Sequence, residues 1–304
     1  MKLAAQLAHL TARVRTAVND ASITLRVHLD GLADDLRKIT DHLVTTDRAG
    51  ARAVGGVAMD APLLRGKSGN TRLWHSFTPD QVRSLPILDP DGAVIGTYFP
   101  SQLTDVKKPL TFTREGLESA RKESHEYREG RGPQEPEWAY VRTAPAPWSQ
   151  NTVFAFAHAD SDGYDVQVKK KIPFTTWSRW VRTEIDGATY GLILAADRHF
   201  KQAVRGAPTA ELVQFSCSPA AGSAALESAK ALDAAGIGVD VYATEKTHLH
   251  LHGNSEEPGL GRLRQKGDRL LGHGSEIEVD WSGNPVKSPW VKYKASGHQP
   301  DMPG

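Results

Sequence analysis

A short apolar run that leads directly into an alanine-rich stretch constrains the fold of this chain more than any other feature. Residues 212–216 read Leu-Val-Gln-Phe-Ser, which is typical of a buried strand in a parallel sheet. Residues 220–235 are rich in strong helix formers and end at Gly236, which indicates a helix. Buried strands that alternate with helices predict an α/β fold built on a parallel sheet.

The only cysteine among the 304 residues, Cys217, lies at this junction. Pro219 is tolerated in the first turn of a helix and Ser218 can cap it, so the pattern places helix N–H groups near the sulfur. Their partial positive charge favours the thiolate, which is the nucleophilic form. The sequence therefore predicts a reactive thiol. The alternative is a buried structural cysteine that packs as a small apolar side chain.

A second apolar run ends in the same way, on a histidine. Residues 152–157 are β-prone and lead to His158, followed by the turn-like residues 159–163. Neighbouring parallel strands lie roughly 4.8 Å apart, and α/β sheets gather their chemistry at the carboxyl ends of the strands. We therefore expect His158 and Cys217 to face one cleft, with a helix over residues 188–204 in the crossover. The alternative is a hydrogen-bonded structural histidine.

At these residues the chain resembles a known group of enzymes. The order of strand, histidine, strand, cysteine and helix resembles the caspase-like cysteine peptidases, and more narrowly the "lonely Cys" domain of large actinobacterial proteins of the polymorphic-toxin type. The matching blocks are residues 72–100, 153–165 and 211–244. The resemblance implies His158 as general acid and base and Cys217 as nucleophile. It also implies an oxyanion hole formed by the backbone N–H groups of Ala159 and Cys217.

The chain departs from that group at two positions. Caspase-like enzymes usually carry glycine after the histidine and soon after the cysteine, whereas this chain has Ala159 and then Ser218-Pro219. Ala159 keeps an N–H group without the conformational freedom of glycine, and Pro219 lacks the N–H donor. An inactive relative with the same fold is therefore an alternative to an active enzyme.

The pattern divides the chain into four parts. Apolar residues recur at helical spacing through residues 1–46, which predicts a helical extension over residues 1–48. This extension either docks on a partner helix or export machinery, or packs on its own domain. Gly- and Ala-rich residues 49–70 indicate a linker, residues 71–296 a caspase-like α/β domain with a mainly parallel sheet flanked by helices, and residues 297–304 a tail.

Within the main domain, residues 93–99 follow the turn signal Asp89-Pro90-Asp91-Gly92 and are expected to form a strand. Residues 163–172 and 174–185 are expected to form strands or a hairpin, and residues 239–243 another parallel strand. Residues 113–137 are dense in charge and predict a surface loop, which in a self-processing peptidase is a natural cleavage segment.

Charge and composition bound the partners. Lysine and arginine total 37 against 36 acidic residues, a formal net charge of +1, so the balance indicates neither a nucleic-acid nor a membrane partner. No stretch reaches about 18 apolar residues, and the N-terminal pattern does not fit a signal peptide. We expect a cytoplasmic protein or one exported without such a signal. The expected partner is a protein or peptide substrate, with no cofactor.

Two further groups of side chains are candidates for a site. Asp160 and Asp162 would border the cleft beside His158 and select a basic side chain of the substrate, or else belong to a solvated turn. His248, His250 and His252 alternate along a β-prone stretch, so they would project from one face of a strand with donors that zinc or copper accepts. The alternative is a polar strand face without metal.

Three functions follow from these patterns. The first is a cysteine endopeptidase, either self-processing or a toxin effector, that uses His158 and Cys217. The second is a non-enzymatic toxin-delivery or interaction module that keeps a degenerate caspase-like fold. The third is a metal-dependent hydrolase that uses the three histidines.

Overall fold

The computed structural model describes residues 62–102, 105, 108–131, 138–172, 175–207, 210–252 and 269–295, without the side chains of residues 250–252 and 269. The predicted helical extension (1–48), most of the predicted linker and the tail (297–304) lie outside these residues. The α-helices are α2 (Arg114–Lys122), α3 (Gly187–Ala196), α4 (Arg198–Gly206) and α5 (Ala224–Ala234), with a 3₁₀ turn η1 (Pro79–Gln81).

The strands form three groups along one continuous hydrogen-bonded network. The central group is β3 (Leu85–Leu88), β4 (Val94–Phe99), β8 (Thr152–Ala159), β11 (Glu211–Phe215), β12 (Val241–Thr244) and β15 (Trp290–Tyr293). The second is β1 (Leu64–Ser68), β2 (Trp74–Phe77), β9 (Tyr164–Lys171) and β10 (Ser178–Ile185). The third is β5 (Leu110–Phe112), β6 (Glu123–Glu129), β7 (Trp138–Pro145), β13 (His248–His252) and β14 (Arg269–Glu276).

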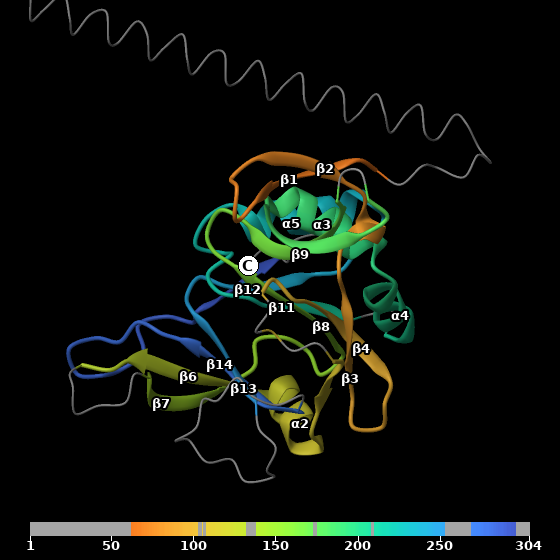
Figure 1. Ribbon diagram of the computed structural model, residues 1–304. Helices are drawn as coiled ribbons and strands as arrows, with labels where there is room; N and C mark the ends of the chain where they lie inside the picture. Colours follow the sequence, from red (N-terminus) through yellow and green to blue (C-terminus); the bar gives the residue numbers. More distant parts are fainter. Residues whose placement is uncertain are drawn as a thin grey trace, which may run out of the picture. The chain divides into compact units, whose positions relative to one another are not determined.

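A four-stranded parallel sheet is the core of the central group. β4, β8, β11 and β12 lie side by side in that order, and all three of these pairings are parallel (Figure 1). β3 pairs antiparallel with β4 at one side, and β15 pairs antiparallel with β12 at the other. The predicted α/β class with a mainly parallel core is confirmed.

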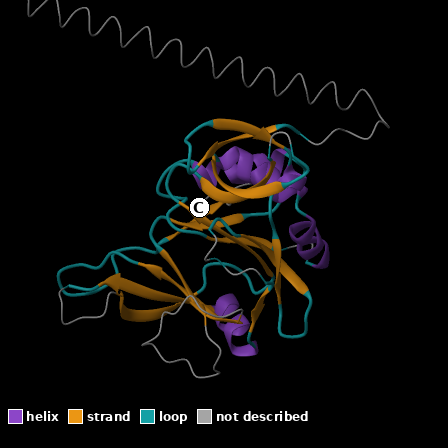
Figure 2. Cartoon of the chain, viewed as in Figure 1, coloured by secondary structure: helices purple, strands orange, loops and turns teal. Residues whose placement is uncertain are grey.

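Apolar residues point to both faces of this sheet, as a covered parallel sheet requires. Phe154, Phe156 and Phe215 pack on one face with Trp148 and with α2. The alternate residues of the same strands, Val153, Ala155 and Leu212 among them, pack on the opposite face with α3, α4 and α5. Figure 2 shows these helices on the side away from α2.

The carboxyl end of β8 continues into the antiparallel second group. β8 pairs with β9, β9 with β10, β10 with β1 and β1 with β2, each antiparallel. The predicted hairpin over residues 163–185 is thus confirmed as β9 and β10. The predicted strands at 93–99 and 239–243 are also confirmed, as β4 and β12, with Gly92 at a φ of 88° in the turn before β4.

The predicted helix over residues 188–204 is wrong in one respect, because the chain forms two helices there. Asp197 ends α3 and caps α4, since its side chain accepts hydrogen bonds from the N–H groups of His199 at 3.1 Å and Phe200 at 2.9 Å. Gly191 lets α3 approach α5 closely, because a Cβ there would lie 2.5 Å from the carbonyl oxygen of Ser228.

The predicted surface loop over residues 113–137 is also wrong where the structure describes it. The side chain of Thr113 caps α2 by accepting a hydrogen bond from the Gly116 N–H at 3.0 Å, and Leu117 and Ala120 bury the inner face of that helix. β6 follows at once and pairs with β7 and β14. Residues 132–137 lie outside the described residues.

The predicted linker over residues 49–70 extends too far along the chain. Leu64 is buried, and β1 pairs with both β2 and β10, so residues 64–68 belong to the folded domain rather than to a linker before residue 71. Across the described part of the chain, no helix combines the length and apolar character needed to cross a membrane.

Candidate active site

The register of the central sheet places His158 and Cys217 at matching points. β8 and β11 are neighbours and parallel, and Phe156 is paired with Phe215 at the end of their ladder. His158 lies two residues beyond Phe156, and Cys217 lies two residues beyond Phe215. The predicted adjacency of the two strands is therefore confirmed, and both residues follow the carboxyl ends of the paired segments.

The loops that follow these strands also contact each other. The N–H of Ala224 donates to the carbonyl oxygen of Ser161 at 3.4 Å. Gly222 approaches the same residue so closely that a Cβ at position 222 would lie 2.3 Å from the Ser161 carbonyl oxygen. The turn after His158 and the loop after Cys217 are thus packed together.

Both residues emerge on the same face of the sheet. Side chains alternate along a strand, so His158 shares the face of Phe154 and Phe156. The sulfur of Cys217 donates to the carbonyl oxygen of His248 at 3.5 Å. The His248 ring stacks on Phe215, which belongs to that same face, with ring centroids 4.6 Å apart.

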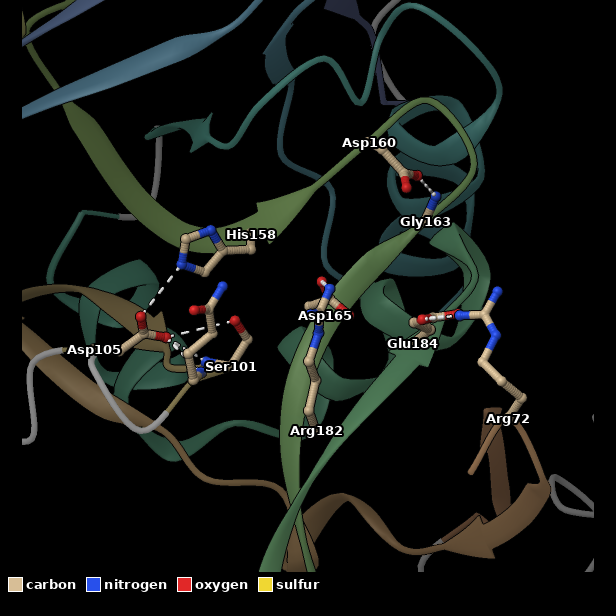
Figure 3. A network of polar contacts seen from close by, with 10 residues as sticks. Arg72, Ser101, Asp105, His158, Asp160, Gly163, Asp165, Arg182 and Glu184 are labelled. Atoms are coloured by element: carbon tan, nitrogen blue, oxygen red, sulfur yellow. Dashed lines mark hydrogen bonds and ion pairs between the residues drawn. The ribbon is translucent and has the colours of Figure 1, made fainter. Parts of the chain in front are cut away.

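His158 is held by a carboxylate that the sequence reasoning missed. Nε2 of His158 lies 3.4 Å from Oδ1 of Asp105, and the two side chains are 43% and 10% exposed. The other carboxylate oxygen of Asp105 accepts hydrogen bonds from the N–H groups of Ser101 at 2.6 Å and Gln102 at 2.8 Å. Figure 3 shows His158 directed at this fixed carboxylate.

The pKa values of this pair move in opposite directions. The hydrogen bond with Asp105 raises the pKa of His158 above its ordinary value, against burial, which lowers it. Burial raises the pKa of Asp105, but the hydrogen bonds from His158, Gln102 and Ser101 outweigh it and leave that pKa below its ordinary value. Asp105 therefore favours the imidazolium form of His158.

Cys217 does not lie at a helix N-terminus, so the expected activation of its thiol by a helix is wrong. α5 begins only at Ala224, and Ser218 has a left-handed φ of 56°. The N–H groups of Ser218 and Ala220 donate to the carbonyl oxygens of Lys246 at 3.0 Å and Thr244 at 3.1 Å, so the loop runs beside the end of β12. Burial raises the pKa of the Cys217 thiol, and the negative charge of Glu276 raises it further.

Of the two backbone N–H groups expected to form an oxyanion hole, that of Ala159 is directed towards β11. The Asp160 N–H donates to Gly163 at 3.0 Å, towards β9, and the Glu211 N–H donates to the carbonyl oxygen of Asn151 at 3.1 Å, towards β8. Successive residues of a strand direct their backbone groups to opposite sides. The N–H of Ala159, in phase with Asn151, therefore points to the side of β11 and Cys217. Within the described residues, the Cys217 N–H has no acceptor.

Asp160 and Asp162 lie in the turn between β8 and β9. Oδ1 of Asp160 accepts hydrogen bonds from the N–H groups of Asp162 at 2.9 Å and Gly163 at 3.0 Å, so this carboxylate holds the turn together (Figure 3). Both residues are exposed. Their expected place at the border of a cleft and their proposed role in substrate selection stay predictions.

The alternating histidines lie on β13, as expected, but His248 is buried rather than part of an exposed polar face. Its Nδ1 lies 3.2 Å from Oγ of Ser275, and its ring packs between Phe215 and Trp290. The side chains of His250 and His252 lie outside the described residues. Among the described side chains, no group of three or more potential ligands is arranged to hold a metal ion.

Comparison of the chain with protein-family models, curated proteins and solved structures finds no match. The geometry is therefore the basis for function: an imidazole that faces a carboxylate, and a thiol at the matching position of the next strand.

Proposed function

We propose that this chain is a cysteine endopeptidase in which Cys217 is the nucleophile and His158 the general acid and base. The observation that carries the proposal is the in-register parallel pairing of β8 and β11, because His158 and Cys217 each lie two residues beyond the last pair, Phe156 and Phe215. The arrangement resembles the caspase-like peptidases, in which a histidine and a cysteine follow adjacent parallel strands. The toxin-type context of that resemblance belongs to the proposal as well.

His158 supplies the base in a defined orientation. Because Nε2 faces Asp105, a neutral ring that carries its proton on Nε2 keeps the lone pair of Nδ1 available to accept a proton. Nδ1 takes the proton from Cys217 as the sulfur attacks the scissile carbonyl carbon. Asp105 then stabilises the imidazolium that this step creates.

The remaining steps balance without a cofactor. The carbon–sulfur bond forms, the negative oxygen of the tetrahedral intermediate is stabilised by the N–H groups of Ala159 and Cys217, and the carbon–nitrogen bond breaks as His158 protonates the leaving amine. Water, deprotonated by His158, then hydrolyses the thioester and releases the acid and the free thiol. Asp160 and Asp162, beside this site, would favour a basic side chain in the substrate.

The raised pKa of Cys217 favours the second candidate function, a non-enzymatic interaction module with a degenerate caspase-like fold. A buried thiol bonded to a carbonyl oxygen is the expected state of an inert structural cysteine. The metal-dependent alternative, with His248, His250 and His252, gains no support from the described side chains.

Labelling of Cys217 with iodoacetamide at near-neutral pH separates the first two candidates. In the enzyme, His158→Ala should slow labelling by at least about tenfold, since general-base assistance is typically worth about 10²–10⁴ in rate. His199→Ala, at a half-buried histidine on α4, is the matched control and should leave the rate unchanged. Equal rates in the folded parent and in His158→Ala would show that the histidine does not act on the sulfur.

Asp105→Asn tests whether Asp105 acts on the ionisation of His158. A residue with only a structural role would not change the pH dependence of peptide turnover. The substitution keeps a polar side chain but removes the charge, so the pKa of His158 should fall and the acid limb of peptide turnover should move to lower pH. An acid limb at the same pH in both proteins would contradict the role given to Asp105.

A further inference from the structure

One face of the antiparallel sheet formed by β2, β1, β10 and β9 is rich in basic side chains and is exposed except at Gln167, which is buried against Arg83 and Gln102. The pairings in this sheet show no register shift, so paired residues share a face. The inner face holds buried residues such as Leu64, Val168 and Val181. The outer face carries Arg65, Lys67, Lys169, Lys171 and, at its centre, Trp180 and Arg182.

The acidic side chains on this outer face are already paired. Arg182 contacts Asp165 at 2.6 Å, and Arg72 contacts Glu184 (Figure 3). In the part of the chain that the structure describes, no carboxylate forms an ion pair with Arg65, Lys67, Lys169 or Lys171. The face therefore has a net positive charge, although the whole chain carries only +1.

The two tryptophans of this face, Trp74 and Trp180, are exposed, and each has an arginine guanidinium over its ring. The Arg65 guanidinium lies 5.6 Å from the Trp74 ring centroid, and that of Arg83 lies 5.7 Å from the Trp180 ring centroid. Proteins that bind single-stranded nucleic acid use open aromatic rings on which bases stack. Here each ring already contacts a guanidinium group, and arginine pairs with carboxylates through two hydrogen bonds, which favours carboxylates as ligands.

This face is continuous with the candidate active site. His158 on β8 is paired with Asp165 on β9, and Asp165 is bonded to Arg182 on β10. The charges of Asp165 and Arg182 both act on the pKa of His158. Figure 3 shows His158, Asp165 and Arg182 in succession across the three strands. A polypeptide bound at His158 can thus continue over β9 and β10.

We infer that the outer face of β1, β2, β9 and β10 binds an acidic, extended segment of the protein substrate, outside the site of cleavage. The inference rests on the proposed peptidase function for its role in catalysis, while the binding itself rests on the charge of the face. Carboxylate side chains of the substrate would pair with the basic side chains, chiefly Lys169 and Lys171, and the peptide would pass along the sheet towards His158. The sequence alone did not predict this surface.

Direct binding to the Cys217→Ala chain tests the inference without turnover. The probe is a fluorescein-labelled twelve-residue peptide of alternating glutamate and glycine, measured by fluorescence anisotropy at low salt. The face variant is Lys169→Glu with Lys171→Glu. The control is Lys201→Glu with Lys230→Glu, two exposed lysines on α4 and α5 that give the same change in net charge. We expect at least tenfold weaker binding in the face variant, and little change in the control.

Equal weakening in both variants would overturn the inference, because binding would then follow net charge alone. Tighter binding of a single-stranded twelve-nucleotide thymidine oligomer than of the peptide, lost in the face variant, would assign the surface to nucleic acid instead. The proposed peptidase function is tested separately, because iodoacetamide labelling that does not depend on His158 would refute it. Even then, peptide binding that is lost only in the face variant would support the docking surface.

Discussion

His273 should make the folded protein sensitive to acid. Its side chain is 1% exposed, and its ring stacks on Phe215 with centroids 4.3 Å apart, beside Trp148 and Trp290. Burial and, to a smaller extent, the positive charge of His125 lower the pKa of His273 from 6.5 to about 3, and nearby backbone carbonyls offset only part of this effect. The folded protein therefore holds this ring neutral.

The sign of the effect follows from proton uptake. In the unfolded chain the ring takes up a proton near pH 6.5, but in the folded chain only near pH 3, so acid stabilises the unfolded state. The stability from the neutral ring is complete above pH 6.5 and is lost as the pH falls towards 3. Between pH 8 and pH 5 the loss for a single site is about 2 kcal/mol, since one pKa unit is worth about 1.4 kcal/mol.

His273→Phe tests this reasoning, because phenylalanine has a similar shape and suits the aromatic surroundings. Urea unfolding at pH 8 and pH 5 should show an acid-induced loss of stability smaller by about 2 kcal/mol in the variant than in the parent. His199→Gln, at a half-buried histidine, is the control and should change this difference much less. An unchanged pH dependence in His273→Phe would refute the reasoning, because His273 would then not be held neutral by burial.

Two further changes probe the packing that supports the site. Gly191→Ala should lower the free energy of unfolding, measured with urea, by about 1–3 kcal/mol. The added methyl group would lie 2.5 Å from the Ser228 carbonyl oxygen and push α3 away from α5. An unchanged stability would contradict the close approach of the two helices. Tyr164→Phe should also lower the free energy of unfolding by about 1–3 kcal/mol, because the buried Gln214 side-chain oxygen loses the hydroxyl that donates to it at 2.6 Å. A loss of only a few tenths of a kcal/mol would show that this hydrogen bond contributes little.

The strands that carry the site could be predicted because each is a short apolar run with a clear end. β8 and β11 are buried on both faces, so their sequences read as continuous apolar segments. Parallel strands bring their carboxyl ends to one edge, and this alone predicts that the residues after the two runs are neighbours. The crossover helices were foreseen in outline, although the capping role of Asp197 divides them.

The loop after Cys217 could not be predicted, because its composition and its structure disagree. Residues 219–223 have the alanine content of a helix, but Ser218 adopts a left-handed conformation and the next residues hydrogen-bond beside β12. Those bonds join residues far apart in the sequence, and helix propensity is a weak guide where tertiary contacts compete with it. The predicted helix dipole at the sulfur failed for this reason.

Asp105 and the basic outer face were missed for a related reason. Asp105 lies in a loop without periodicity, and only the folded chain brings it to His158. The lysines and arginines of the outer face are dispersed among three strands, β1, β9 and β10, and the near-zero net charge of the chain gives no sign of them. Strand register, rather than composition, brings these groups together, so a single sequence could predict that β8 and β11 are neighbours but neither Asp105 nor the basic surface.

The pKa shifts at the site bear on how the proposed dyad would work. Burial raises the pKa of Cys217, so forming the thiolate alone is disfavoured, whereas Asp105 raises the pKa of His158 and favours the imidazolium. Proton transfer from sulfur to imidazole creates both charges together, and the stabilised imidazolium offsets part of the cost of the thiolate. Each pKa unit of His158 is worth about 1.4 kcal/mol in this step. The raised pKa of His158 lowers activity at low pH, because there His158 is already protonated and cannot accept the thiol proton. Above that range, the same rise makes His158 a better proton acceptor.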